Sequence, residues 1–160
     1  MGGIEKIPKH CANLVILSHV VEHFFNVGKE IDGIQDLLLP GGYLYIELPG
    51  VFNLQPYSYD FLKSLQNAHN YYFTLETLEQ VLSFYGWKLE QGDETIRSVF
   101  RYTGHRNDVL TNYYPKVNSS LIYFEQTRHV SQMRYFLSKK HLLQLRAHAI
   151  NLFKVKNSNP

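Results

Sequence analysis

The chain has 160 residues, of which 44% are hydrophobic and 19% charged, and this balance predicts a globular rather than a disordered protein. A single cysteine, Cys11, excludes an internal disulfide framework and fits a reducing compartment. No apolar run approaches the length of a membrane span, and no basic-then-apolar leader opens the sequence. We therefore expect a cytoplasmic protein without a membrane span.

The charges are unevenly distributed along the chain. Residues 1–125 carry nine Lys/Arg against fourteen Asp/Glu, whereas the remainder has no acidic residue. The basic residues there are Arg128, Arg134, Lys139, Lys140, Arg146, Lys154 and Lys156. This asymmetry marks a compositional boundary near residue 125, and we expect a domain over residues 1–104 followed by a basic helical extension over residues 105–160. The basic residues alternate with an apolar stripe and no nucleic-acid-binding motif is present, so the sequence argues against nucleic acid as a partner.

A strand, a helix and a second strand are predicted within residues 13–50. Residues 14–17 form a short continuous apolar run, which is typical of a strand buried on both faces of a parallel sheet. The helix should begin after Asn26, a suitable N-cap, and stop at Pro40-Gly41-Gly42, because proline cannot continue it. Its apolar face has spacings of four, three and four: Val27, Ile31, Ile34 and Leu38. A strand over residues 43–48 follows, and the two strands should be parallel neighbours.

Later elements are predicted by similar signals. Phe61 and its apolar neighbours indicate a short helix, and Thr74 should cap a helix that ends at Gly86. Residues 87–91 and 95–102 are typical of two strands joined in a hairpin at Gly92-Asp93. A helix should run from about residue 115 to 137. Ser138 would then cap a second helix, with an apolar face formed by Leu142, Leu145, Ala149 and Leu152.

The segment His19-Val20-Val21-Glu22-His23 spells H-x-x-E-H, a motif of zinc hydrolases in which two histidines on one helix face bind the metal. Here His19 lies at the end of an apolar strand, and the helix begins only near Asn26. The two histidines should therefore not share a helical face. A zinc hydrolase built on His19, Glu22 and His23 is an alternative that its context does not support, and we predict no metal site.

Four stretches carry a family resemblance: LVILSHVVEHF, LLLPGGYLYIELPG, HNYYFT at residues 69–74, and Gly86-Trp87. Over roughly residues 10–102 the chain resembles the C-terminal half of a class I S-adenosylmethionine-dependent methyltransferase. The branch that acts on sugars, quinones and lipids looks most similar. The resemblance implies an α/β fold, a partial Rossmann-like sheet with strands 4, 5, 7 and 6 of the family order, followed by C-terminal helices. It also implies methyl transfer from S-adenosylmethionine to a small-molecule acceptor.

The cofactor-binding half of that family has no counterpart in the sequence. The family's glycine-rich loop after its first strand, and the acidic residue that ends its second strand, would have to precede Leu14, where too few residues stand. We therefore expect a truncated domain that is inactive on its own and binds S-adenosylmethionine poorly. The alternative is a non-catalytic half-domain that serves as an interaction module.

The resemblance also indicates candidate site residues. Ligands of open α/β sheets bind at the carboxyl ends of the strands, which points to the turn after the first strand. Ser18 and His19 should contact the cofactor there. Glu22 and His23 should face the acceptor, with His23 or His69 as the catalytic group that accepts a proton. In the competing interpretation Glu22 and His23 only orient the entrance of the helix, and the sequence does not separate the two.

The first predicted strand should have an unpaired edge, because the family's neighbouring strand is missing. Residues 14–17 contain neither charge nor proline to block such an edge. We therefore expect self-association, or binding of a partner chain, through residues 13–18.

Overall fold

A computed structural model describes residues 7–156, except for the side chains of residue 141 and residues 145–156. Its sheet has the strand order β1-β2-β4-β3, in which β1 is parallel to β2 and β4 is antiparallel to both β2 and β3. The strands are β1 Ala12–Ser18, β2 Leu38–Glu47, β3 Trp87–Gln91 and β4 Arg97–Tyr102. The fold is mixed α/β, compatible with a Rossmann-like sheet, and the predicted parallel pair and hairpin are confirmed.

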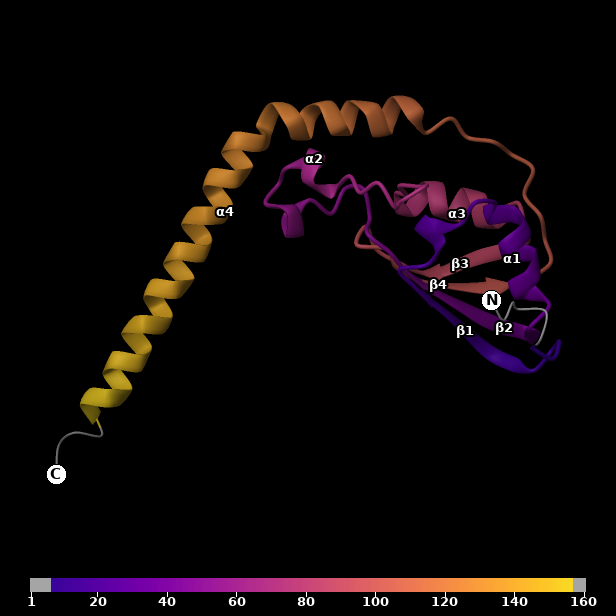
Figure 1. Cartoon of the computed structure of the whole chain (residues 1–160), viewed down its shortest axis with the longest axis horizontal. Helices are drawn as coiled ribbons and strands as arrows, with labels where there is room; N and C mark the ends of the chain where they lie inside the picture. The colour runs from indigo at the N-terminus through magenta and orange to yellow at the C-terminus, as the bar shows by residue number, and fades with distance from the viewer. Residues whose placement is uncertain (1–6, 157–160) are drawn as a thin grey trace.

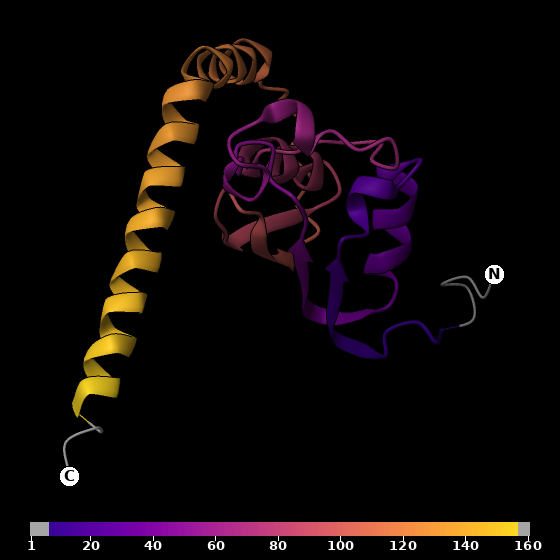
Figure 2. The same ribbon diagram turned by 60° about the vertical axis from the view of Figure 1, so that its left-hand side comes forward.

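Helical segments connect and follow these strands. They are η2 Val21–His23, α1 Val27–Gln35, η3 Gln55–Tyr57, α2 Phe61–Ser64, α3 Leu75–Ser83 and α4 Tyr114–Lys156. Figure 1 shows α4 bending and extending away from the body that contains the sheet, and Figure 2 shows the same arrangement from another side. None of the helices in the described part of the chain combines the length and apolar character needed to cross a membrane.

Two of the three predicted helix caps, Asn26 and Thr74, are confirmed. The side chain of Asn26 accepts a hydrogen bond of 3.0 Å from the backbone N–H of Lys29 at the start of α1. Thr74 and Thr77 bond each other's backbone N–H reciprocally at the start of α3. Such side chains satisfy N–H groups that have no partner within the helix, which fixes where the helix begins.

The end of α1 differs from the prediction. The helix stops at Gln35, and Leu38 begins β2 instead of extending the apolar face of the helix. Leu38 is buried in the core and lies opposite Ala12 in the parallel ladder. Gly41 has a φ of 75°, so the glycine allows a turn of the backbone within the strand and does not end a helix. The sequence pattern at Leu38 fits both a helix and a strand. Its pairing with Ala12 of β1 places it in the strand.

One hydrophobic core lies between the sheet and the helices α1 and α3. Leu44 and Ile46 of β2 and Phe100 of β4 are fully buried on this face. They pack in one cluster with Ile31 of α1 and Leu78 of α3. The alternation of side chains along a strand then directs the intervening residues of β2 to the other face of the sheet.

That other face contradicts the expectation of a strand buried on both sides. Val15 and Leu17 of β1 pack against the core, but Leu14 and Ile16 are 49% and 60% exposed. In the ladder Leu14 lies opposite Tyr43, which is also exposed. A strand is buried on both faces only where helices cover both, and in the described part of the chain the core and its helices lie on one face.

We expect the chain to self-associate through β1. Within residues 7–156 this strand pairs only with β2, so it forms one edge of the sheet, beside the exposed Leu14 and Ile16. Ile16→Lys places a charge on this surface without entering the core, and should shift the chain toward monomer in size-exclusion chromatography with light scattering. Val109→Lys, in an exposed loop far from the strand in sequence, is the matched control. A cooperatively melting monomer for the unmodified chain would contradict the expectation.

The predicted pair of C-terminal helices is wrong, because α4 is a single helix from Tyr114 to Lys156. Ser138 caps nothing; its hydroxyl donates a hydrogen bond of 2.8 Å to the backbone carbonyl of Tyr135 within the helix. No glycine or proline occurs between residues 116 and 156 to interrupt the helix. Of the predicted apolar face, Leu142 is exposed. The remaining members lie outside the described side chains: Leu145, Ala149 and Leu152.

Candidate functional site

The carboxyl ends of β1 and β2 meet at one edge of the sheet, and a cavity of about 450 Å³ lies there. Its lining residues come from the two strand ends, the segment after β2 and the start of β4. They are His19, Glu47, Leu48, Pro49, Asn53, Gln55, Pro56, Tyr57, Thr95 and Arg97. This is the position at which open α/β sheets bind their ligands.

His19 links this cavity to the turn beneath it. The residue follows β1 with a φ of 54°, in the left-handed region, and its N–H donates a hydrogen bond of 2.8 Å to the carbonyl of Glu47. Its exposed ring lines the cavity, while Nδ1 lies 3.4 Å from Oε1 of Glu22. A strained backbone conformation held by the surrounding structure is characteristic of functional turns.

Glu22 lies within η2 and is 1% exposed. Neither of its carboxylate oxygens has a hydrogen-bond partner among the described residues. Its backbone carbonyl, in contrast, accepts hydrogen bonds from the N–H groups of Asn70 and Tyr71, at 2.8 and 3.2 Å. The carboxylate is therefore buried by a turn whose backbone is fixed.

The loop that contains His69 docks onto the turn that contains His23. The side chain of Asn70 donates to the backbone carbonyls of His23 and Phe24, at 3.1 and 3.2 Å. Nδ1 of His23 lies 2.8 Å from the carbonyl of Ala68. Since a carbonyl only accepts, Nδ1 donates this hydrogen bond, and in the neutral ring the lone pair is then on Nε2. The rings of His23 and His69 meet edge to face, with centroids 4.9 Å apart.

Three of the predicted site residues thus form one cluster. Possible ligand atoms of Glu22, His23 and His69 all lie within 4.8 Å of one another, although His69 is distant in sequence. His19 borders this cluster on the cavity side. Ser18 differs: it ends β1, is exposed and is not among the residues that line the cavity.

Two charged residues of the cavity, Glu47 and Arg97, form an ion pair across neighbouring strands. Nε of Arg97 lies 3.3 Å from Oε1 of Glu47, its partner in the antiparallel ladder, and both line the cavity. Arg97 and Arg101 are four residues apart on β4 and therefore share one face of the strand. Arg101 does pair at the surface, with Glu90. Only the register of β2 against β4 identifies the Arg97–Glu47 pair.

The hairpin at the rim of the cavity is held by Asp93. Its carboxylate accepts hydrogen bonds from the hydroxyl and the N–H of Thr95, and the side-chain bond is the main reason why the pKa of Asp93 lies below its ordinary value. A lowered carboxyl pKa means stabilisation that is present above the ordinary pKa and is lost as pH falls through the lowered one. The contribution of Asp93 to the rim should therefore be lost only in acid.

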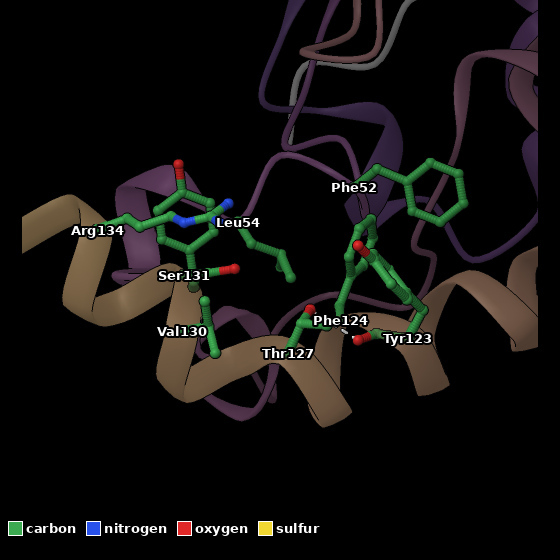
Figure 3. A pocket seen from close by; sticks show the side chains of 9 residues that line it. Phe52, Leu54, Tyr123, Phe124, Thr127, Val130, Ser131 and Arg134 are labelled. Carbon is green, nitrogen blue, oxygen red and sulfur yellow. Dashed lines mark hydrogen bonds between the residues drawn. The ribbon is translucent and has the colours of Figure 1, made fainter.

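A second cavity, of about 310 Å³, lies between the segment after β2 and α4 (Figure 3). It is lined by Phe52, Leu54, Tyr59, Tyr123, Phe124, Thr127, Val130, Ser131 and Arg134. The rings of Phe52 and Phe124 meet edge to face with centroids 5.6 Å apart, and Arg134 is the one charged side chain among the lining residues. Phe52 and Leu54 line this second cavity, whereas the neighbouring Asn53 and Gln55 line the first. The segment after β2 therefore separates the two cavities.

The glycines test whether the described residues fit S-adenosylmethionine, which the resemblance implies. A side chain at Gly50 would overlap the backbone carbonyl of Glu94, and one at Gly28 would overlap the phenol of Tyr85. These glycines allow close approach of the Glu94 backbone and the Tyr85 ring, so no space for a ligand lies against them. Within residues 7–156 no strand precedes β1 either. At the strand ends, the described residues therefore show no glycine-lined cradle for the cofactor.

Comparison with known families places this site within a recognised domain. The model of a family described as methyltransferase domain matches residues 5–91. The matched range includes β1, β2 and residues 48–57, which follow β2 and contribute lining residues to the first cavity. It also includes Glu22, His23 and His69. No curated protein matches the chain.

Proposed function

The chain belongs to the methyltransferase domain family, and from that premise we propose that it acts in methyl transfer from S-adenosylmethionine to a small-molecule acceptor of the sugar, quinone or lipid kind. The observation that carries this proposal is the location of the cavity at the strand ends. It lies at the carboxyl ends of β1 and β2, and all its lining residues except Thr95 and Arg97 fall inside the matched range. Glu22, His23 and His69 lie next to it through His19.

We assign β1, β2, β4 and β3 to strands 4, 5, 7 and 6 of the family order. The parallel pair β1–β2, followed by the antiparallel strands β4 and β3, supports this assignment. It makes the described residues the acceptor-side half of the domain, and it places Ser18 and His19 where the cofactor would lie.

Acceptor activation is the role we give to Glu22, His23 and His69. Nε2 of His23 has a free lone pair and its side chain is exposed, so it can meet an incoming hydroxyl group. The aromatic cavity beside α4 suits an apolar or ring-containing part of the acceptor, with Arg134 facing an anionic substituent. The two cavities, on either side of the segment 52–57, would then hold different parts of one acceptor.

A non-catalytic half-domain is the second candidate function. The observation in its favour is that the chain packs closely at Gly50, where a side chain would overlap the backbone carbonyl of Glu94, and leaves no glycine-lined cradle there. In that case the open edge of β1 would be the working surface. The zinc-hydrolase alternative gains no such support, because His19 and His23 do not share a helix: His19 precedes the three-residue η2.

We expect the 160-residue chain to show no saturable binding of S-adenosylmethionine at micromolar concentration in titration calorimetry. In the proposed assignment, the polar contacts that hold the cofactor come mainly from a half of the domain other than the one the described residues form. Joined to a glycine-rich half of another family member, the chain should bind the cofactor and transfer a labelled methyl group to small hydroxylated acceptors. A micromolar dissociation constant for the chain alone would contradict the incomplete site. A chimera that binds cofactor but methylates no acceptor would favour the interaction module.

A further inference from the structure

We propose that Glu22, His23 and His69 hold a divalent transition-metal ion of the zinc class. The three side chains offer one carboxylate and two imidazoles, with possible ligand atoms within 4.8 Å of one another. Mixed nitrogen and oxygen ligands suit Zn²⁺ and its first-row neighbours, whereas Mg²⁺ and Ca²⁺ prefer oxygen alone. The H-x-x-E-H motif alone does not reveal these three ligands, because His69 comes from a separate loop.

The carboxylate of Glu22 is the first independent argument for the ion. It is 1% exposed, yet neither oxygen has a hydrogen-bond partner among the described residues. A buried carboxylate without a donor is strongly unfavourable, and such a group calls for a compensating ion, water or partner. The nearest basic group is the ring of His19, 3.4 Å from one oxygen. A cation between Glu22 and the two neighbouring histidines supplies the missing charge.

The orientation of the His23 ring also favours a bound ion. Its Nδ1–H donates to the carbonyl of Ala68, which fixes the ring and leaves Nε2 free to bind a metal. Histidine ligands in metal sites generally donate their other ring N–H in this way. The carbonyl belongs to the residue before His69, so the same loop that orients one ligand carries the other.

Hydrogen bonds also hold the two ligand-bearing segments together before any ion binds. Asn70 bonds the carbonyls of Glu22, His23 and Phe24 through its backbone and side chain. Tyr71 adds bonds to the carbonyls of Glu22 and Phe25. These contacts tie η2 to the His69 loop around the cluster. A site assembled in this way loses little conformational entropy when the ion enters.

Three protein ligands leave at least one coordination position open, as catalytic zinc sites do. His23 is exposed, so this position is open to solvent and to a ligand. In a part of the inference that rests on the proposed function, an oxygen of the acceptor would bind there. The charge of the ion would lower the pKa of that oxygen and favour its deprotonation.

The test is a zinc titration of the full chain after treatment with a chelator. Calorimetry should give one Zn²⁺ per chain with a dissociation constant in the micromolar range or tighter. His23→Ala, His69→Ala and the nearly isosteric Glu22→Gln should each weaken binding by at least ~10²-fold, since each removes a ligand. Co²⁺ in place of Zn²⁺ should give visible absorption bands in the parent that these variants lose.

His129→Ala is the matched control, because it removes an exposed imidazole of α4 outside the cluster. It should bind zinc as the parent does, and circular dichroism should show that all variants are folded. Absence of saturable binding at roughly 100 µM Zn²⁺, or equal binding by the parent, His23→Ala and His69→Ala, would overturn the proposal. The assay contains neither methyl donor nor acceptor, so its outcome is independent of the proposed methyl transfer.

Discussion

Replacing His23 by alanine in a chimera competent for methyl transfer is expected to lower turnover by ~10²–10⁴-fold, the range over which loss of a proton-transfer group acts. The expectation rests on the ring's geometry. Nδ1 is committed to Ala68, so Nε2 is the atom available to the acceptor, or to an ion that binds the acceptor. Alanine removes that atom and leaves the backbone of η2, which Asn70 also holds, in place.

The affinity for S-adenosylmethionine should change little in this variant, because the proposed cofactor contacts are Ser18 and His19 and do not include His23. Steady-state kinetics of labelled methyl transfer, with a separate cofactor titration, would divide the effect between turnover and binding. His105→Ala, at an exposed position outside the cluster, is the control and should keep the parent's turnover. Turnover within about threefold of the parent would make His23 structural, since general-base loss is far larger.

Phe100→Ala should lower the free energy of unfolding by ~3–5 kcal/mol, the usual effect of removing a buried phenylalanine side chain. Phe100 is 0% exposed in β4, where it lies opposite Leu44 on one side and Leu89 on the other. Truncation leaves a void in the cluster between the sheet and the helices. Domains of this size are stable by only ~5–15 kcal/mol, so the variant should be near the limit of folding.

The control for this change is Phe25→Ala, the same substitution at a side chain that is 92% exposed. It should change stability by less than ~0.5 kcal/mol. Urea unfolding can be followed by the fluorescence of Trp87, which is the only tryptophan and is buried in the same cluster. Protein concentration should be varied, because association through β1 would add to apparent stability. A loss below ~1 kcal/mol for Phe100→Ala would show that the core is not packed as described.

The sequence by itself determined the local elements. Asn26 and Thr74 cap helices in the structure because their side chains reach N–H groups within the next turn. The apolar run after Asn13 forms a strand, and the Gly92-Asp93 turn joins two more. Each of these signals depends on a few neighbouring residues, so it can be recognised from the sequence without knowledge of the rest of the fold. The family match also depends on local stretches, and the sequence sufficed to propose Glu22, His23 and His69 as site residues.

Only the tertiary structure decided which sides of those elements are buried and which residues meet. Leu38 joins β2 because Ala12 pairs with it, and Ile16 is exposed because the described helices pack on the other face. Glu47 and Arg97 pair through the register of two strands that are distant in sequence. His69 reaches Glu22 because a loop docks on η2 through the backbone and side chain of Asn70. Burial and long-range pairing depend on what the whole chain places nearby, and hydrophobic spacing along one segment carries no information about that.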